Sequence, residues 1–337
     1  MVGAAQARLR AEVFSELTTM AKAGVTIGQS LTAIGEDLEH ARMSAVLTEM
    51  GMQVSSGETL TDAMRRHLDL FSPVTVSMVE VGEKGGRLEH ALRVAAEYHE
   101  HDFELRHLLT RETAYPIVLF AIIIFIMPIA NFIKTWIAGP GFLSALIGLV
   151  FQLIFIAVSV GVPVAAVVLL VKAYSGSEQG ALALDGAKLK VPLVGNVIRK
   201  LCLARACRAL ASLYSSGVLM GTSLRLAGEA AGNRAVAREL TRNVAKVEGG
   251  GKLSEALGES PLIPRMVVRM LSTGEDTGDI DKMAHNVADH FEEEAQTAIK
   301  QMAVSITPVA VLIAGVIVAI MAISFYTGGY VRLLGID

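Results

Sequence analysis

Two short stretches that combine glycines with an acidic residue are the first candidates for chemistry in this chain. They are Gly82-Glu83-Lys84-Gly85-Gly86 and Gly274-Glu275-Asp276-Thr277-Gly278. A phosphate-binding Walker loop needs the pattern GxxxxGK[ST] between a strand and a helix. The sequence has neither that spacing nor a preceding strand. We therefore interpret each stretch as the end of a helix followed by a tight turn, with the first helix ending at Gly82 and the chain turning at Gly85-Gly86.

The acidic residue of each stretch, Glu83 or Glu275, has two interpretations. Its carboxylate either anchors the turn by accepting backbone amides, or contributes to a docking surface for a partner. The glycines of the same candidate site are Gly82, Gly86, Gly274 and Gly278.

Histidines and acidic residues on two predicted helices are the candidates for a metal site. A zinc protease motif places two histidines on one helix face. His99 and His101 are instead two residues apart and point about 160° away from each other on a helix. Asp281, His285 and Asp289 share a face, which we interpret as solvated, with a weak metal site as the alternative. We interpret the run Glu292-Glu293-Glu294 as solvated too.

Other chemistry is excluded by what the sequence lacks. It contains no GxSxG, no GxGxxG and no Ser/His/Asp order typical of a hydrolase. Nucleic-acid binding needs a basic stripe, whereas the net charge is -3. Cys202 and Cys207 are five residues apart on a predicted helix and are interpreted as small core residues in a reducing compartment. We predict no catalytic residue, no cofactor, no metal ligand and hence no enzyme.

The elements around these stretches occur twice along the chain. Gly24-Val25 matches Gly217-Val218 at an offset of 193 residues, and Gly82 matches Gly274 at an offset of 192. Such self-similarity is the signature of a duplicated structural unit. In each copy the apolar residues recur at helical spacing, without the alternation typical of strands. This pattern predicts about six short helices per copy. The predicted class is all-α.

Long uncharged runs follow each copy. The mean hydropathy is +0.49, and residues 114–133, 135–171 and 301–331 contain no charged side chain. The second run is too long for one span and is broken at Gly139-Pro140-Gly141. About 20 apolar residues suffice to cross a bilayer as a helix. We therefore predict three transmembrane helices, with Pro116 and Pro308 as candidate hinges where helices enter the first and third.

The positive charges set the orientation of these spans. Arg106 and Arg111 precede the first, and Lys172, Lys188 and Lys190 follow the second, which places both repeats in the cytoplasm and the C-terminus outside. The predicted layout is repeat 1 at 1–113, transmembrane helices at 114–137, 146–171 and 302–327, an external loop at 138–145, a cytoplasmic linker at 172–190, repeat 2 at 191–301, and an external tail at 328–337.

The two repeats differ in charge. Residues 1–113 hold 11 Lys/Arg against 17 Asp/Glu, whereas residues 172–301 hold 17 against 15. The acidic first repeat could dock a basic surface of a partner, and drift on solvated faces is the alternative.

Three motifs resemble those of a known family. Each copy opens with Ala-Gly-Val or Ser-Gly-Val, each has a proline followed by G-E-x-x-G-x-[LI]-[ED], and Val191 to Lys200 reads [VI]-P-L-x-G-x-x-[IV]-R-K. These features resemble the inner-membrane platform proteins of type II secretion systems and type IV pilus assembly machines, in their two-repeat branch. Longer members have an extension before the first domain, whereas here that domain starts within about ten residues.

The resemblance implies a role in assembly. Such a protein sits in the inner or plasma membrane of a bacterium or archaeon and couples a cytoplasmic hexameric ATPase to the insertion of pilin or pseudopilin subunits into a filament. The implied partners are that ATPase, the pilins, other inner-membrane assembly proteins, membrane lipids and further copies of the chain, with no nucleic acid. A transporter or channel subunit built from parallel repeats, or a membrane scaffold without a motor, is the alternative.

Overall fold

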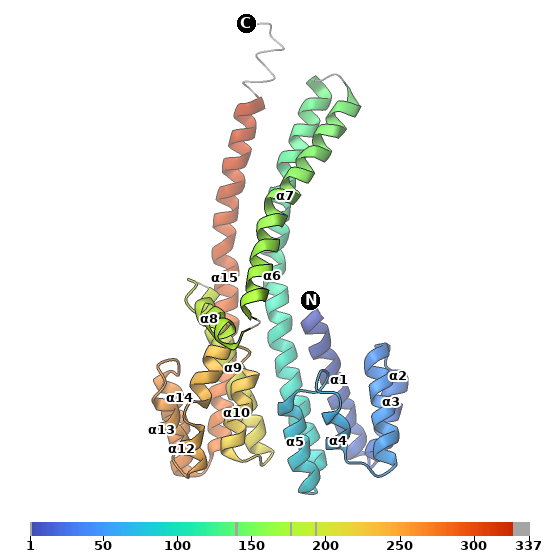
Figure 1. The fold of residues 1–337 in the computed structure, drawn as a ribbon, viewed down its shortest axis with the longest axis vertical. Helices are drawn as coiled ribbons and strands as arrows, with labels where there is room; N and C mark the ends of the chain where they lie inside the picture. The colour runs from blue at the N-terminus through green and yellow to red at the C-terminus, as the bar shows by residue number, and fades with distance from the viewer. Residues whose placement is uncertain (1, 139–140, 176, 193, 326–337) are drawn as a thin grey trace. The chain divides into compact units, whose positions relative to one another are not determined.

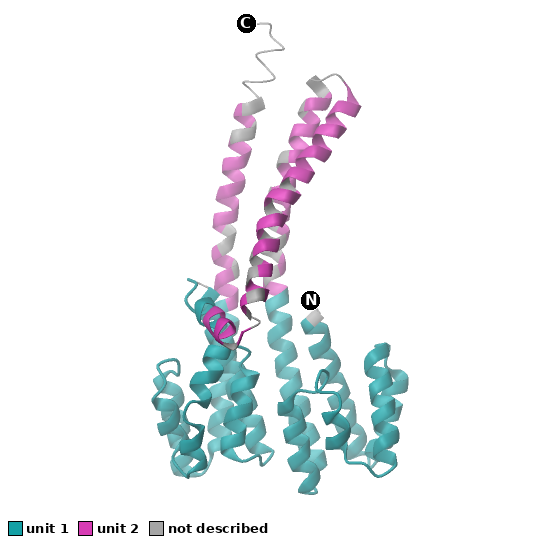
Figure 2. Ribbon diagram, viewed as in Figure 1, with its two compact units in different colours: residues 1–110, 185–298 teal, residues 111–184, 299–337 magenta. Residues whose placement is uncertain are grey.

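The computed structural model of the chain describes residues 2–138, 141–175, 177–192 and 194–325. All regular secondary structure in these residues is α-helix, which confirms the predicted all-α class (Figure 1). The chain divides into two units (Figure 2). Residues 1–110 and 185–298 form what we call the helical unit, and residues 111–184 and 299–337 form the apolar unit.

The N-terminal half of the helical unit, residues 1–110, is built from short helices. They are α1 (Val2–Lys22), α2 (Ile27–Asp37), α3 (Ala41–Ser55), α4 (Leu60–Arg65), α5 (Pro73–Lys84) and the start of α6 (Leu88–Ala138). Ser72 caps α5 by accepting the amide of Thr75, and Pro73 occupies the first turn, where no amide donor is needed. The sequence therefore specifies the start of α5 locally.

The end of α5 differs from the sequence-based prediction. We expected the helix to end at Gly82, but α5 continues to Lys84. Gly82 is buried inside the helix, and the chain turns only at Gly85 and Gly86. Gly86 has a φ of 66°, a left-handed conformation that glycine adopts without steric cost.

The C-terminal half of the helical unit, residues 185–298, repeats this arrangement with two differences, an additional helix at its start and one helix divided in two. Its helices are α8 (Glu178–Lys188), α9 (Val194–Ser215), α10 (Met220–Ala230), α11 (Arg234–Thr241), α12 (Val244–Glu248), α13 (Leu253–Gly258), α14 (Arg265–Thr277) and the start of α15 (Ile280–Phe325). Helices α11 and α12 stand where the N-terminal half has α3. The break falls at Asn243, whose side-chain amide donates to the carbonyl of Ala256 and to Oε2 of Glu259.

A histidine lies at the centre of the N-terminal core. His99 of α6 is 2 % exposed and stacks on Phe14 of α1 with ring centroids 4.9 Å apart. Its Nε2 lies 3.0 Å from Oγ1 of Thr75. The sequence offsets pair Phe14, Thr75 and His99 with Cys207, Val267 and Phe291, all of which are buried in the C-terminal half. The two cores thus fill equivalent positions with different side chains.

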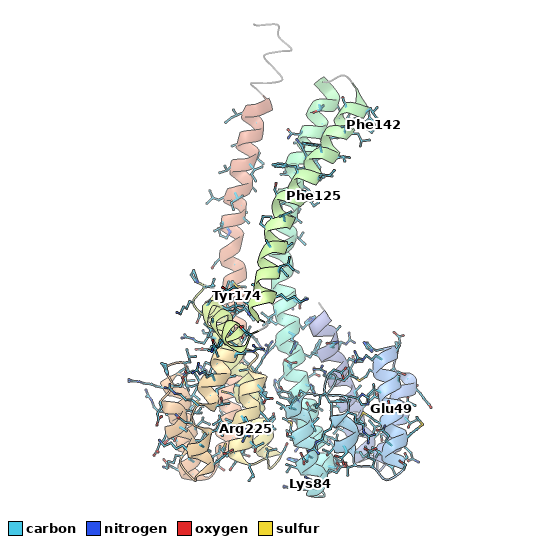
Figure 3. All side chains as sticks on the ribbon, viewed as in Figure 1. Glu49, Lys84, Phe125, Phe142, Tyr174 and Arg225 are labelled. Atoms are coloured by element: carbon cyan, nitrogen blue, oxygen red, sulfur yellow. The ribbon has the colours of Figure 1, made fainter. Side chains whose placement is uncertain are left out.

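The apolar unit contains the remainder of α6, the whole of α7 (Phe142–Ser175), the first part of α8 and the remainder of α15. In the described residues one segment, Phe142–Pro163, is long and apolar enough to cross a membrane, and Ile124–Ile133 and Pro308–Ala319 are shorter apolar stretches. Large apolar side chains such as Phe125 and Phe142 are more than half exposed on these helices (Figure 3).

The detailed membrane layout stays a prediction. The spans at 114–137, 146–171 and 302–327 are not tested beyond the one long apolar segment. Gly139-Pro140 and the predicted external tail at 328–337 lie outside the described residues. Pro308 lies inside α15. Pro116 lies within the bounds of α6, but its side chain is outside the described part of the chain.

Candidate functional site

Glu83 binds the start of a neighbouring helix rather than its own turn. Its Oε1 accepts the amide of Leu60 at 2.7 Å, and its Oε2 accepts the amide and hydroxyl of Thr61 at 3.0 and 2.6 Å. Leu60 and Thr61 are the first two residues of α4. Amides at a helix start have no partner within the helix and carry partial positive charge. The carboxylate therefore satisfies two such donors and places its negative charge where the helix dipole favours it.

Glu275 makes the same set of contacts in the C-terminal half. Its Oε1 accepts the amide of Leu253, and its Oε2 accepts the amide of Ser254 at 3.1 Å and the hydroxyl of the same serine. Leu253 and Ser254 begin α13. Lys252, at the N-cap of α13, provides no side-chain cap, so the carboxylate from α14 performs that role.

The first glycine of each stretch permits close helix packing. A Cβ placed on Gly82 would lie 2.2 Å from the Cβ of Ala91 on α6. A Cβ on Gly274 would lie 2.9 Å from Cγ of Met283 on α15. Real Cβ atoms do not approach so closely, so any larger residue would push the two helices of each corner apart.

The last glycine of each stretch turns the chain. Gly86 and Gly278 have φ values of 66° and 79°, and Gly278 is the left-handed C-cap of α14. Each of the six candidate residues therefore has a local structural contact or conformation. We call each set, namely Gly82, Glu83 and Gly86 or Gly274, Glu275 and Gly278, a helix corner.

A second cluster, which sequence reasoning missed, is centred on a buried arginine. Arg208 of α9 is 5 % exposed. Its guanidinium donates from Nε and Nη2 to the two carboxylate oxygens of Glu292 on α15, each at 2.8 Å, and from Nη2 to Oδ1 of Asp289. A planar fork of donors matches a carboxylate in this bidentate way.

The cluster also joins the two halves of the helical unit. His101 of α6 places Nδ1 3.1 Å from Oε2 of Glu292. We call His101, Arg208, Asp289 and Glu292 the charged junction. Close by, Nε of Arg205 lies 3.8 Å from Oδ1 of Asp102. The junction connects α6, α9 and α15 through charged side chains.

Burial and pairing act in opposite directions on Glu292. Burial alone would raise the pKa of its carboxyl, but His101 and Arg208 beside it outweigh that effect and lower the pKa. The interpretation of Glu292 as a solvated residue was therefore wrong, because its side chain is buried and paired. The acid-rich sequence could not reveal this, since its partner arginine is 84 positions away.

The face of α15 that carries Asp281, His285 and Asp289, which we predicted to be solvated, makes contacts within the protein at two of these residues. Asp289 pairs with Arg208. The imidazole of His285 lies 2.9 Å from the backbone carbonyl of Asp281. In the described residues no group of three or more His, Cys, Asp or Glu side chains is arranged to hold a metal ion.

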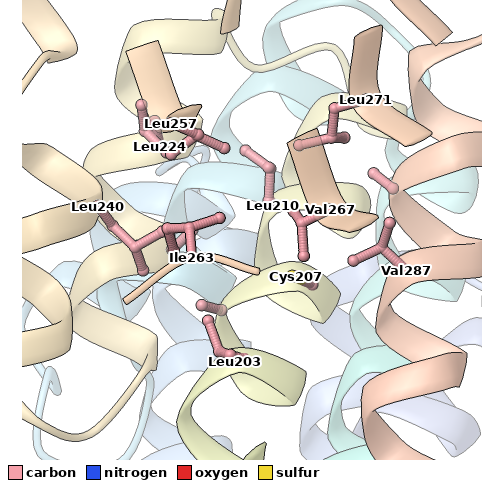
Figure 4. Close-up of a pocket in the computed structure, with 13 residues that line it drawn as sticks. Leu203, Cys207, Leu210, Leu224, Leu240, Leu257, Ile263, Val267, Leu271 and Val287 are labelled. Atoms are coloured by element: carbon pink, nitrogen blue, oxygen red, sulfur yellow. The ribbon is translucent and has the colours of Figure 1, made fainter. Parts of the chain in front are cut away.

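An apolar cavity in the C-terminal half is too small for a ligand. It has a volume of about 20 Å³, which is close to the space of one water molecule. Leucine, valine and alanine side chains surround it, together with Cys207 (Figure 4). Cys207 stands where the N-terminal half has the much larger Phe14, which accounts for space at this position.

Both cysteines have inert environments. Burial raises the pKa of the Cys202 thiol to about 11 and that of Cys207 to about 12. The thiolate is the reactive form of cysteine, so neither side chain is suited to nucleophilic or redox chemistry near neutral pH.

Comparison with known proteins gives matches along nearly the whole chain. The sequence profile of the family described as type II secretion system (T2SS), protein F, matches residues 13–133 and again residues 206–328. The chain is 32% identical to the type IV pilus assembly protein PilC of Thermus thermophilus, over 93% of this chain and 80% of that protein.

The relatives include proteins named for type IV pilus assembly and proteins named for type II secretion. The type IV pilus assembly protein TapC of Aeromonas hydrophila is 29% identical over 93% of this chain and 79% of its own length. The type II secretion system protein F of Vibrio cholerae is 26% identical over 91% of this chain and 78% of its own length.

Proposed function

This chain belongs to the family of type II secretion system protein F, and from this premise we propose that it is the inner-membrane platform protein of a type IV pilus or type II secretion machine. In that role it couples a cytoplasmic hexameric ATPase to the insertion of pilin or pseudopilin subunits into a filament. The observation that carries the proposal is the double match of the family profile, at residues 13–133 and 206–328.

The proposed membrane placement has three spans, at 114–137, 146–171 and 302–327. Both halves of the helical unit then lie in the cytoplasm, with the N-terminus inside and the C-terminus outside. The long apolar segment Phe142–Pro163 supports the second span. The lysines and arginines around the predicted cytoplasmic ends support the orientation.

Coupling in this proposal runs along two helices. Helix α6 extends from Leu88 to Ala138 and α15 from Ile280 to Phe325, so each begins in the helical unit and ends in the apolar unit. In this proposal, movement imposed on a helix corner is transmitted along α6 or α15, because each is one continuous helix. Pro116 and Pro308 are the proposed hinges, because proline removes a helical hydrogen bond and favours a kink.

The proposed partners follow from the same role. They are the hexameric ATPase, pilin or pseudopilin subunits, other inner-membrane assembly proteins, membrane lipids and further copies of the chain. The acidic N-terminal half, with 11 Lys/Arg against 17 Asp/Glu in residues 1–113, is proposed to dock a basic surface of the ATPase. Affinity between motor and full-length protein should then fall steeply with added salt.

Neither a transporter nor an enzyme is favoured. The relatives are named for pilus assembly and secretion. The clusters of charged residues in the helical unit are engaged in helix capping and ion pairs. We propose that the protein acts by binding and transmitting movement, without a catalytic centre of its own.

Co-purification tests the proposal directly. The tagged full-length protein is solubilised from its native membrane, and its partners are identified by mass spectrometry. A hexameric assembly ATPase together with pilin-like or secretion subunits is the expected result and would name the system. An abundant, folded protein that retains none of these partners would reject the platform role.

A further inference from the structure

We propose that a groove beside the start of α14 binds the turn between α2 and α3 of a second copy of this chain. The groove is formed by the end of α13, the loop that follows it and the first turns of α14, and we call it the α14 groove. The turn, which we call the acidic turn, consists of Glu36, Asp37, Leu38 and Glu39. The contact rests on the partnership with further copies proposed above and gives it an interface, which needs neither the motor nor the filament.

The α14 groove is a hollow of about 660 Å³ within the C-terminal half of the helical unit. Helices α13 and α14 lie side by side there (Figure 1). The lining combines apolar with charged side chains, and it includes Pro261, Pro264, Val268, Glu259, Arg265 and Arg269. A hollow of this size admits several side chains of a partner, in contrast to the apolar cavity of about 20 Å³ in the core.

The positive charge of the groove is not used within the chain. Glu259 is engaged elsewhere, because its carboxylate accepts from Nζ of Lys246 at 3.0 Å and from the side-chain amide of Asn243 at 2.8 Å. Arg265 and Arg269 are exposed, and neither has an ion-pair partner within the described residues. They are four residues apart on α14 and therefore lie on one face of the helix. The groove thus presents two free positive charges beside apolar surface.

The acidic turn carries the opposite charge. Glu36, Asp37 and Glu39 are exposed, and none of them has an ion-pair partner among the residues that the structure describes. Glu36 and Asp37 are the last two residues of α2, and Leu38 follows them in an extended conformation with its side chain half-buried. The turn therefore offers three negative charges and one partly exposed apolar side chain within four residues.

Both sets of charges lie at the helix end that disfavours them. The C-terminal end of a helix carries partial negative charge, and the N-terminal end carries partial positive charge. Glu36 and Asp37 end α2, whose last turn has no basic residue, and Arg265 begins α14, whose first turn has no acidic residue. Charges that break local rules in this way are expected at functional surfaces. Contact between the turn and the groove offsets both unfavourable placements at once.

Each surface occurs in only one half of the chain. At the positions that match the two groove arginines, the N-terminal half has Pro73 and Ser77. At the positions that match the three acids of the turn, the C-terminal half keeps only the first, and its residues are Glu229, Ala230 and Gly232. The charges therefore complement each other between an N-terminal and a C-terminal half. A contact between unlike surfaces of two copies either closes into a ring or continues into an open assembly.

The occupant of the groove is a second copy rather than another protein, because one sequence contains both complementary surfaces. Within a single chain the turn and the two arginines stay exposed, so the halves of one copy do not satisfy each other. The attraction also extends beyond the two surfaces. Residues 1–113 hold 11 Lys/Arg against 17 Asp/Glu, whereas residues 172–301 hold 17 against 15, so unlike halves of two copies attract each other.

Charge reversal in two separate variants of the full-length protein tests the contact. The groove variant carries Arg265→Glu and Arg269→Glu, and the turn variant carries Glu36→Lys, Asp37→Lys and Glu39→Lys. Each protein is purified in excess detergent as two populations with different fluorophores on a C-terminal tag. Energy transfer between the populations, followed over a series of protein concentrations, measures self-association. No other protein is present, so a failure here leaves the platform role to the co-purification experiment.

Each variant alone should self-associate at least about tenfold more weakly than the unmodified protein, because like charges then face each other. An equimolar mixture of the two variants should recover the affinity, since the acidic groove of one meets the basic turn of the other. A second chain cannot repair damage to folding in this way. The matched control is Arg234→Glu with Arg238→Glu, which reverses two exposed arginines at the same spacing at the start of α11 and should keep the affinity.

Four outcomes would overturn the proposal. The first is an unmodified protein that stays monomeric throughout the concentration series. The second is a mixture that associates as weakly as either variant alone, while both variants melt at the temperature of the unmodified protein. The third is a control variant that loses as much affinity as the groove variant, which would assign the effect to net charge. The fourth is a turn variant that self-associates normally but no longer retains the ATPase, which would assign the acidic turn to the motor.

Discussion

His101 and Glu292 come from opposite halves of the chain, yet Nδ1 of the histidine lies 3.1 Å from Oε2 of the glutamate. Glu292 is at the same time held by the buried guanidinium of Arg208. One carboxylate thus connects the two helices α6 and α15 that continue into the apolar unit. A platform that transmits movement needs its two halves to move together, and this contact provides a direct link between them.

Removal of Arg208 should destabilise the C-terminal half strongly. Arg208→Met leaves Glu292 buried without its main partner, and breaking a buried pair in this way costs about 3–5 kcal/mol. Hydrogen exchange of α9 and α15 in the full-length protein would measure the loss. The double variant Arg208→Met, Glu292→Leu should recover much of it, because no buried charge is left. Arg225→Met, which breaks an exposed pair with Glu248, should change little. Equal losses in both arginine variants would contradict the central role of the junction.

Glu83 should control the stability of α4. Glu83→Ala removes three hydrogen bonds from the start of that helix, and an unsatisfied donor costs about 1–3 kcal/mol. Exchange of the Leu60 and Thr61 amides should then be faster by about tenfold or more. The matched control is Glu80→Ala, one turn earlier on α5, which breaks only ion pairs with Arg65 and Lys84. Unchanged exchange at both amides would show that the carboxylate is dispensable.

Glu275 offers an independent repetition of that experiment. Glu275→Ala should expose Leu253 and Ser254 in the same way, since its carboxylate makes the equivalent contacts. If either corner instead served only as a docking surface, the variant would lose filament assembly while its amide exchange stayed at the level of the unmodified protein.

Gly82→Ala should force α5 and α6 apart. The added methyl group would lie 2.2 Å from the Cβ of Ala91, and overpacking of this kind costs about 1–3 kcal/mol. Gly82→Ala combined with Ala91→Gly restores the space and should recover part of the loss. Gly186→Ala in α8 meets no atom within 4 Å and should be neutral or stabilising. Melting of the three variants in the same detergent is the measurement, and similar melting temperatures would refute the close approach.

His99 should make the N-terminal half sensitive to acid. Burial, with Arg10 as a smaller contribution, lowers the pKa of His99 to about 3, well below the usual range of a histidine. Below about pH 6.5 the unfolded chain binds a proton that the folded chain does not. Stability should therefore decrease as the pH falls from about 6.5 toward 3, by up to about 1.4 kcal/mol per pH unit.

A pair of substitutions copied from the other half provides the control for His99. His99→Phe with Thr75→Val reproduces the residues at the matching positions, Phe291 and Val267, which are buried. The variant has no imidazole to protonate. The protection factors of amides in α1, α5 and α6, which are corrected for the intrinsic pH dependence of exchange, should therefore lose most of their dependence on pH between about 5 and 7. An unchanged pH dependence would assign the effect to another group.

The local features of this fold were predictable from the sequence. The helix start at Ser72 depends on a hydrogen bond that reaches only three residues along the chain. The duplication follows from Gly82 and Gly274 standing at matched positions, and the long uncharged runs are visible by inspection. Apolar spacing and capping chemistry act over one or two helical turns, which explains why they can be recognised without coordinates.

The partners of the charged side chains were decided only by the tertiary structure. One interpretation of the sequence was that Glu83 anchors its own turn, with a docking surface as the alternative, but the fold brings its carboxylate to Leu60 and Thr61. It suggested that Glu292 faces water, but the fold buries it against Arg208. Ionic and capping groups carry no mark of which distant residue will meet them. That depends on how helices pack, and packing depends on the whole set of buried side chains at once.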